Sequence, residues 1–254
     1  MVRGIETFKT YFKDHADKYI IIGGTALDIQ MEDAGFTPRA TKDIDIILVV
    51  EALNTDFVKA FWEFIKEGNY QQKEKGGEKR QYYRFVKPEK DNFPYQIELF
   101  AKNPDILDLD EGTHLTPIPV EVELSSLSAI LMDEDYYNLT LEQSEVQDDV
   151  HIANPKALIA LKAKAFLDWS KRKAEGHSEC DKHIKKHKAD IFRLTMLLPS
   201  DETIETPANV KADLQKAANM IADQLPDKAI LKTMGAQVPP LEVFKQFKQI
   251  FNLN

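Results

Sequence analysis

Apolar positions in the first half of the chain fall into short runs with the spacing of β-strands. The run YIII at 19–22 is rich in β-branched residues and ends at two glycines, which predicts a strand followed by a turn. The run DIDIILVV at 43–50 is apolar on both faces and therefore predicts a strand at the centre of its sheet. Three later runs are also typical of strands: QYYRFV at 81–86, YQIELFA at 95–101 and PIPVEVEL at 117–124.

Helical spacing of apolar residues separates the early strands and then dominates the second half of the chain. It predicts early helices over 5–18, 25–34 and 56–66. From residue 154 onward the helical spacing continues almost to the end, with breaks at Pro199, Pro207, Pro226, Pro239 and Pro240. The sequence therefore predicts an α+β fold, with a mixed β-sheet flanked by helices over 1–150 and an all-helical domain over 151–254.

The composition is that of a globular chain that folds on its own. The 254 residues are 43% hydrophobic and 30% charged, and they are enough to bury a sizeable core. A single cysteine, Cys180, excludes an intramolecular disulfide. The N-terminus lacks the apolar core of a secretion signal, and no apolar run approaches the roughly 20 residues that span a bilayer. These features predict a cytoplasmic protein without a membrane partner.

Two aspartates lie at the start of the predicted central strand. Asp43 and Asp45 are two positions apart, so their side chains share one face of the strand, with Cα atoms roughly 6.5–7 Å apart. Neighbouring carboxylates repel each other unless a cation lies between them, and a pair at this spacing can ligate one or two Mg²⁺ ions. The alternative is a solvated strand end, because the same spacing recurs at 108–110 and 133–135, in stretches typical of turns.

A glycine turn and a third acid extend this pattern. Gly23 and Gly24 let the backbone approach a ligand closely, the following helix N-terminus favours a phosphate, and Thr25 adds a hydroxyl donor. The alternative is an ordinary turn, since the stretch is neither a P-loop nor a dinucleotide-binding turn. Glu98 is an acid within an otherwise buried strand. It is a candidate metal ligand or general base, or else it pairs with a lysine or faces solvent.

The stretch IIGGTALDIQMEDAGFTPRATKDIDIIL resembles the signature of the DNA polymerase β-like nucleotidyltransferases. In that superfamily a Gly-Gly or Gly-Ser turn, a short helix and Asp-hydrophobic-Asp precede a third acid on a later strand. The fuller pattern, Gly-Gly-Thr-Ala-Leu and then Arg-x-Thr-x-Asp-hydrophobic-Asp, is similar to the AbiEii branch, the toxin-like enzymes of abortive-infection systems. Arg39 and Thr41 match the arginine and threonine of that branch.

The helical half carries a second part of the resemblance. NPKALIALKAKAFLD and the later KKHKADIFRL are similar to the branch's Leu-Lys helix and to its Asp-x-x-Asp-Leu helix, with Lys162 and Asp190 at matching positions. The sequence departs from the branch at two positions. His187 replaces the first aspartate of the later motif, and Glu98 stands where an aspartate is commoner.

The resemblance implies a Mg²⁺-dependent enzyme that moves a nucleoside monophosphate from a nucleoside triphosphate, such as ATP, to a hydroxyl acceptor. Asp43, Asp45 and Glu98 would be the catalytic and metal-binding residues, holding one or two ions, and the nucleoside triphosphate would lie in the cleft between the two domains. The implied nucleotide contacts are Gly23, Gly24, Thr25, Arg39, Thr41, Lys162, Lys188 and Asp190. The acceptor stays open between RNA, protein and a small molecule such as an antibiotic. A cognate antitoxin is the implied partner, and a non-catalytic nucleotide-binding protein is the remaining alternative.

The segment 171–188 is basic within an acidic chain. It holds seven Lys and Arg residues against three acids, whereas the whole chain has a net charge of −9. Such a segment is either a solvated helix face or a surface that attracts a triphosphate or an anionic acceptor. It also contains an i,i+4 pair, His183 and His187, close to Cys180, which is a weak pattern for a zinc site.

Overall fold

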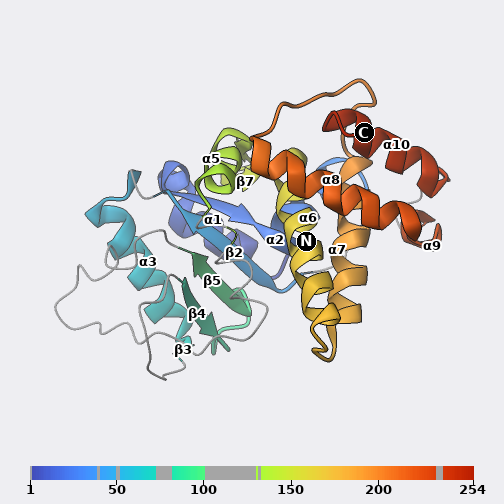
Figure 1. The fold of residues 1–254 in the computed structure, drawn as a ribbon. Helices are drawn as coiled ribbons and strands as arrows, with labels where there is room; N and C mark the ends of the chain where they lie inside the picture. Colours follow the sequence, from blue (N-terminus) through green and yellow to red (C-terminus); the bar gives the residue numbers. More distant parts are fainter. Residues whose placement is uncertain are drawn as a thin grey trace. The chain divides into compact units, whose positions relative to one another are not determined.

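The fold is described here from a computed structural model of the chain (Figure 1). The described residues are 2–38, 41–49, 52–72, 82–100, 130, 133–232 and 237–254. The candidate nucleotide contact Arg39, the predicted strand at 117–124 and the acidic pair at 108–110 lie outside them.

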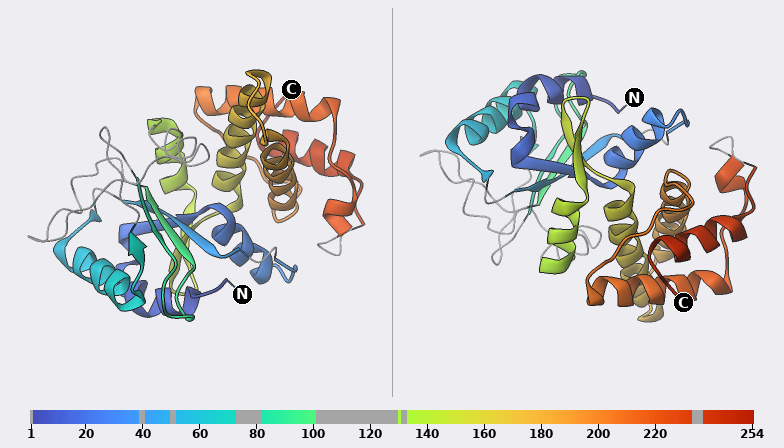
Figure 2. Two further views of the ribbon diagram at one scale, coloured as in Figure 1. Left: turned by 90° about the horizontal axis from the view of Figure 1, so that it is seen from below. Right: turned by 90° about the horizontal axis from the view of Figure 1, so that it is seen from above.

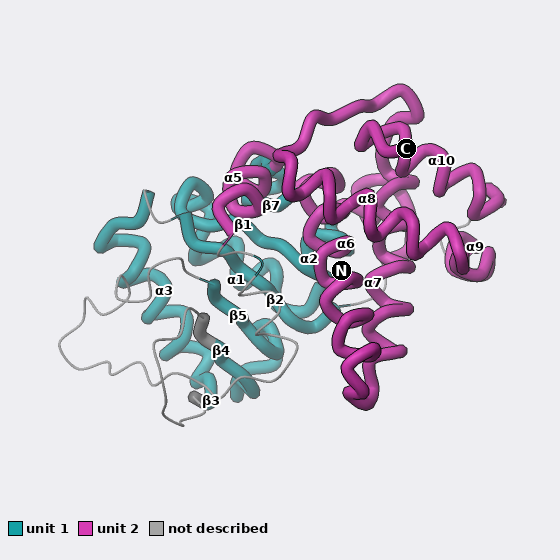
Figure 3. Tube along the Cα trace, in the orientation of Figure 1, with its two compact units in different colours: residues 1–29, 39–131, 144–153 teal, residues 30–38, 132–143, 154–254 magenta. Residues whose placement is uncertain are grey.

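The chain divides into two compact units, which differ in colour in Figure 3. Unit 1 comprises Met1–Ile29, Arg39–Leu131 and Ser144–Ala153, and unit 2 comprises Gln30–Pro38, Met132–Gln143 and Asn154–Asn254. Two short segments from the first part of the chain thus belong to the helical unit. The division into separate domains at 1–150 and 151–254 stays a prediction.

Unit 1 contains a mixed sheet of seven strands in the order β3-β4-β5-β2-β1-β7-β6 among the described residues. The strands are β1 Tyr19–Ile22, β2 Asp43–Leu48, β3 Gln71–Gln72, β4 Tyr82–Val86, β5 Gln96–Phe100, β6 Ser144–Gln147 and β7 Val150–Ala153. Strand β2 is central, parallel to β5 and antiparallel to β1, which confirms the prediction made from its two apolar faces. The hairpin β6–β7 has no counterpart among the predicted elements.

Aromatic helices cover one face of this sheet. Helix α1 (Ile5–Phe12) and helix α3 (Thr55–Gly68) pack together on it, as the views in Figure 2 show. Their rings are buried, and the centroid of Phe12 lies 5.3 Å from that of Phe64. The ring of Phe61 meets that of Phe85 on β4 at 5.5 Å. The helix predicted over 5–18 ends at Phe12, because the polar stretch that follows forms a 3₁₀ helix, η1 Lys13–Lys18.

Helix α2 (Gly23–Asp33) follows β1 directly, and its residues are divided between the two units. Every described helix of the second half lies in unit 2, and this confirms the helical prediction for that part of the chain. These helices are α6 Pro155–Ala174, α7 Cys180–Thr195, α8 Ala208–Asp223, α9 Ala229–Lys232 and α10 Pro240–Ile250. No helix in the described part of the chain combines the length and apolar character needed to cross a bilayer.

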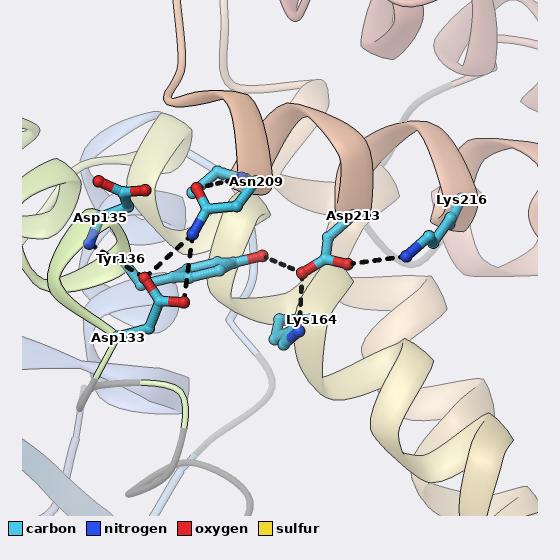
Figure 4. Close-up of polar contacts among 8 residues, drawn as sticks. Asp133, Asp135, Tyr136, Lys164, Asn209, Asp213 and Lys216 are labelled. Carbon is cyan, nitrogen blue, oxygen red and sulfur yellow. Dashed lines mark hydrogen bonds and ion pairs between the residues drawn. The ribbon is translucent and has the colours of Figure 1, made fainter.

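A polar cluster joins three helices of unit 2 (Figure 4). Helix α5 (Glu134–Glu142) begins at Asp133, which caps it by accepting the Asp135 N–H; the acidic pair read as a turn therefore starts a helix. The Tyr136 hydroxyl of α5 and the Lys164 ammonium of α6 both donate to the Asp213 carboxylate of α8, at 3.2 and 2.7 Å. The Asp213 carboxylate thus links α8 to α5 by a hydrogen bond and to α6 by an ion pair.

Candidate active site

Three charged residues stand side by side on neighbouring strands of unit 1. In the sheet register, Asp45 of β2 is paired with Glu98 of β5, and Glu98 is paired with Arg84 of β4. Asp43 is paired in the same way with Gln96. Paired residues share a face of the sheet, and this face is opposite to the one on which Phe85 meets α3. The structure therefore brings Asp43, Asp45 and Glu98 together at one place, as the sequence predicts.

Glu98 is held by two side chains that the sequence analysis did not anticipate. Its Oε1 accepts hydrogen bonds from Nε of Arg84 at 2.9 Å and from Nε2 of Gln96 at 2.6 Å, and Nη2 of Arg84 forms an ion pair with the same oxygen at 2.8 Å. All three donors meet the same oxygen, and no described residue donates a hydrogen bond to Oε2. The side chain of Glu98 is 8% exposed and that of Arg84 is 12% exposed. The acid thus pairs with a buried arginine rather than with a lysine or solvent.

The environment of Glu98 favours its protonated form. Burial, followed by the negative charge of Asp45, raises the pKa of Glu98 to about 9, and the opposing effect of Arg84 is smaller. Asp43 adds a further negative charge. A carboxyl group in this position gains from any cation that binds beside the aspartates, because the cation relieves the repulsion among the three acids.

The raised pKa of Glu98 predicts a falling stability with rising pH. Between its ordinary pKa near 4.5 and about 9, the folded state binds a proton that the unfolded state has released. Its stabilising contribution is therefore complete below pH 4.5 and is lost as the pH approaches 9, with a slope of at most about 1.4 kcal/mol per pH unit. In thermal melts with EDTA, the melting temperature of the wild type should fall relative to that of Glu98→Gln as the pH rises from 4.5 to about 9. Two melting-temperature curves that stay parallel over this range would contradict the prediction.

Gly23 makes room for the carboxylate of Asp45. Its φ is +71°, and a Cβ placed on it would lie 1.8 Å from Oδ2 of Asp45. The Asp45 side chain therefore lies directly against the Cα of Gly23, at the start of α2. Both the left-handed backbone and this contact require glycine. Space for Asp45 is a role for Gly23 that the phosphate-binding interpretation did not include.

Replacing Gly23 with alanine is expected to displace Asp45 and to reduce activity about a hundredfold, the typical cost of misplacing a reacting group by 1 Å. The left-handed backbone should cost a further ~1–2 kcal/mol of stability. Gly35→Ala is the matched control, because Gly35 has φ +76° and no described atom lies within 4 Å of its Cβ position. Equal activity in the two variants would show that the contact with Asp45 is unimportant.

Two buried polar residues of α2 position the aspartate strand. The Thr25 hydroxyl donates to the backbone oxygen of Asp43, and its side chain is fully buried. The hydroxyl therefore positions strand β2 in this structure, and the contact of Thr25 with a phosphate stays a prediction. Asp28, also buried, accepts the backbone N–H of Thr41 at 2.6 Å. Sequence reasoning missed Asp28, although a charged residue among the apolar positions of α2 is a signal of such a role.

The carboxylates of Asp43 and Asp45 could hold a divalent cation whose other ligands are not side chains of the protein. Asp43 and Asp45 are partly exposed, and their oxygens are the hard ligands that Mg²⁺ prefers. Within the described residues, no three or more His, Cys, Asp and Glu side chains converge to hold an ion by themselves. The donor set therefore fits Mg²⁺ only if waters or substrate oxygens complete the coordination, which is usual for this ion.

The lysine and aspartate matched in the helical half meet within unit 2. Lys162 Nζ of α6 lies 3.4 Å from Oδ2 of Asp190 on α7, and Nη1 of Arg193 lies 3.0 Å from Oδ1. Asp190 is fully buried and Lys162 is 7% exposed. A single carboxylate thus serves two cations in the interior. The direct contact of Lys162 or Asp190 with a nucleotide stays a prediction.

Lys188 has a structural contact that the sequence did not indicate. Its Nζ donates to the backbone oxygen of Gln224, the C-cap of α8, at 2.7 Å. Burial, followed by the charge of Lys185, lowers the pKa of Lys188. A cation at a helix C-terminus is favoured by the helix dipole, so the residue stabilises unit 2 whether or not it contacts a nucleotide.

The remaining lysines and arginine of segment 171–188 lie on α6 and α7, as do His183 and His187, whereas His177 lies between the two helices. Lys171 and Lys173 pair with Glu175 and Asp181, whereas Lys182, Lys185 and Lys186 of α7 form no ion pair with any described residue. His183 stacks on the ring of Trp169 with centroids 4.1 Å apart, and Cys180 is buried. The described side chains therefore give the zinc pattern no support.

Comparisons with known proteins identify the family. The family model for the nucleotidyl transferase AbiEii toxin of type IV toxin–antitoxin systems matches residues 10–194. No curated protein matches the chain. Among solved structures, the chain is similar to an antigenic nucleotidyltransferase-like protein from Paracoccidioides brasiliensis, with 15% identity, a TM-score of 0.42 and coverage of 95% of this chain and 97% of that chain. The family match confirms the resemblance carried by the motifs, and the chain belongs to the AbiEii family of nucleotidyltransferases.

Proposed function

We propose that the protein transfers a nucleoside monophosphate from a nucleoside triphosphate to a hydroxyl acceptor, with Mg²⁺ held by Asp43 and Asp45. The observation that carries this proposal is the pairing of Asp45 with Glu98 on adjacent strands, two positions along the strands from Asp43. Three acids on one face of the sheet repel one another unless a cation lies beside them. In a nucleotidyltransferase such a cation would also neutralise the charge of the phosphate groups.

The chain's own groups divide the chemistry between them. Asp43 and Asp45 bind the ion, which when present neutralises phosphate charge and orients the reacting oxygens. The acceptor hydroxyl forms a bond from its oxygen to the α-phosphorus, and the bond from that phosphorus to pyrophosphate breaks. The hydroxyl proton passes to Oε2 of Glu98, the oxygen to which no described residue donates a hydrogen bond. A cation bound at Asp43 and Asp45 would favour the ionised form of Glu98, which is the form that can accept this proton.

Nucleotide binding is proposed at the start of α2. The backbone at Gly23 and Gly24 opens the helix, where unpaired N–H groups and the helix dipole favour phosphate oxygens. Arg39, Thr41, Lys162, Lys188 and Asp190 are further nucleotide contacts that rest on the motif alone. The type IV family also suggests a cognate antitoxin as a partner.

The labelling of a cell extract tests the function directly. Incubation with each labelled nucleoside triphosphate and Mg²⁺, followed by separation of RNA, protein and small molecules, should place label in one of these fractions in a wild-type-dependent manner. Glu98→Gln should abolish it. Label in no fraction, with any of the four nucleotides, would contradict the proposal.

The basic face of α7 separates macromolecular from small acceptors. The face consists of Lys182, Lys185 and Lys186. If the acceptor is RNA, changing all three to glutamine should raise the acceptor concentration needed for half-maximal rate by at least about tenfold and flatten its salt dependence, because each phosphate contact adds roughly one unit to the salt slope. The control changes Lys228, Lys245 and Lys248, elsewhere in unit 2, to glutamine. Equal rates in both triple variants would instead favour a small-molecule acceptor.

A further inference from the structure

Arg84 is the residue at this site whose role neither the motifs nor the family match assigns. It lies on β4, one strand beyond the acids of the signature, and its guanidinium is mostly buried against Glu98. Burying an arginine is costly unless its charge and donors are used. Here Nε and Nη2 both approach Oε1 of Glu98, within 2.9 Å, and Gln96 adds a third donor to the same oxygen.

This arrangement fixes which oxygen of Glu98 is available. Oε1 accepts two hydrogen bonds and also lies 2.8 Å from Nη2 of Arg84, so it has no lone pair in a good direction for a metal ion or an incoming proton. Oε2 accepts no hydrogen bond from the described residues, so it is the atom left for chemistry. The planar guanidinium also sets the orientation of the carboxylate, which a single-point ammonium cannot do.

We propose that Arg84 is a positioning residue, which holds Glu98 through Oε1 so that Oε2 is presented to the reacting hydroxyl. The proposal rests on the proposed function, in which Glu98 takes the proton of the acceptor. Arg84 acts on the reaction only through Glu98 and does not contact the nucleotide. The alternative role for a buried arginine near phosphates is direct binding of the triphosphate, and the two roles make opposite predictions.

The test is a cycle of variants on the full chain, formed by Arg84→Gln, Glu98→Gln and the double variant. The rate of label transfer is measured at saturating nucleotide, together with the nucleotide concentration that gives half the maximal rate. Arg84→Gln should lower the maximal rate about a hundredfold and leave the half-saturating concentration within twofold of the wild type. In the Glu98→Gln background, the same change should have no further effect on the rate.

Two further variants separate charge from geometry. Arg84→Lys keeps the positive charge but loses the fork, so it should recover only part of the rate lost in Arg84→Gln. Arg3→Gln is the matched control, because Arg3 is a partly exposed arginine of the same unit that pairs with Asp91. The control should retain the wild-type rate. Thermal melts establish folding, and the double variant, which removes both charges together, avoids a buried unpaired carboxylate.

Binding provides a readout that does not depend on turnover. Calorimetry with Mn²⁺ and a non-hydrolysable nucleoside triphosphate should give the same affinity for the wild type and Arg84→Lys, within threefold. Weakened nucleotide binding in the Arg84 variants, or a further loss of rate in the Glu98→Gln background, would overturn the proposal in favour of direct phosphate contact. An unchanged rate in Glu98→Gln itself would instead overturn the assignment of Glu98 as the base, a failure of the proposed function that is distinct from these.

Discussion

Asp45→Asn is expected to reduce nucleotide transfer roughly a thousandfold while the fold persists. The change removes one negative charge with little change of shape, and loss of a ligand to a charge-neutralising metal removes several kcal/mol of transition-state stabilisation, at about 1.4 kcal/mol per factor of ten. Stability should hold or rise in the metal-free state, because Asp45 is the main charged neighbour that disfavours ionisation of Glu98. Asp43→Asn is expected to behave in the same way.

Calorimetry with Mg²⁺ and a non-hydrolysable nucleotide, run beside thermal melts, tests this expectation. Both variants should bind metal and nucleotide more weakly than the wild type while melting at or above its temperature. Asp14→Asn is the control, since it removes an exposed aspartate from η1 of the same unit. If Asp43→Asn and Asp45→Asn bind metal and nucleotide as tightly as the wild type, the aspartates are a solvated strand end and the proposed function fails.

The sequence predicted those elements whose pattern is local. Strand β2 is apolar on both faces and lies at the centre of the sheet, and helix α3 extends the predicted range by one residue at its start and two at its end. The hairpin of β6 and β7 gave no such signal. Its turn residues Asp148 and Asp149 both have positive φ, 48° and 63°, a conformation that is usually marked by glycine or asparagine. Strand β6 is also mostly polar, because it lies at an edge of the sheet.

The candidate site was predicted only where acids interrupt apolar runs. Asp43, Asp45 and Glu98 are conspicuous for that reason, and the register then brings them together. Arg84 and Gln96 could not be assigned, because pairing between strands depends on the register, which a single sequence does not reveal. The burial of Thr25 was not predicted for a similar reason. A hydroxyl at the start of a helix suggests a hydrogen bond to a phosphate, and the sequence does not show that its partner is the backbone oxygen of Asp43 on the neighbouring strand.

Asp190→Asn is expected to cause the largest loss of stability, about 3–5 kcal/mol, because it leaves two cations beside a buried neutral amide. Lys162→Met should cost less, since Arg193 still neutralises the carboxylate. The melting temperature should therefore rise in the order Asp190→Asn, Lys162→Met, wild type. Asp213→Asn serves as the comparison, because Asp213 also binds two lysines but is 14% exposed and its cations reach solvent.

The same variants distinguish a structural role of the Lys162–Asp190 ion pair from direct binding of the nucleotide by Lys162. If Lys162 binds triphosphate as its motif predicts, Lys162→Met should raise the half-saturating nucleotide concentration at a temperature where the variant is folded, whereas Asp213→Asn should leave it unchanged. Arg193→Met is the more closely matched control, because it removes the other ion pair of Asp190 and leaves Lys162 unchanged. Equal half-saturating concentrations in Lys162→Met and Arg193→Met would show that Lys162 serves the interior of unit 2 and that its match to the family motif reflects packing rather than nucleotide binding.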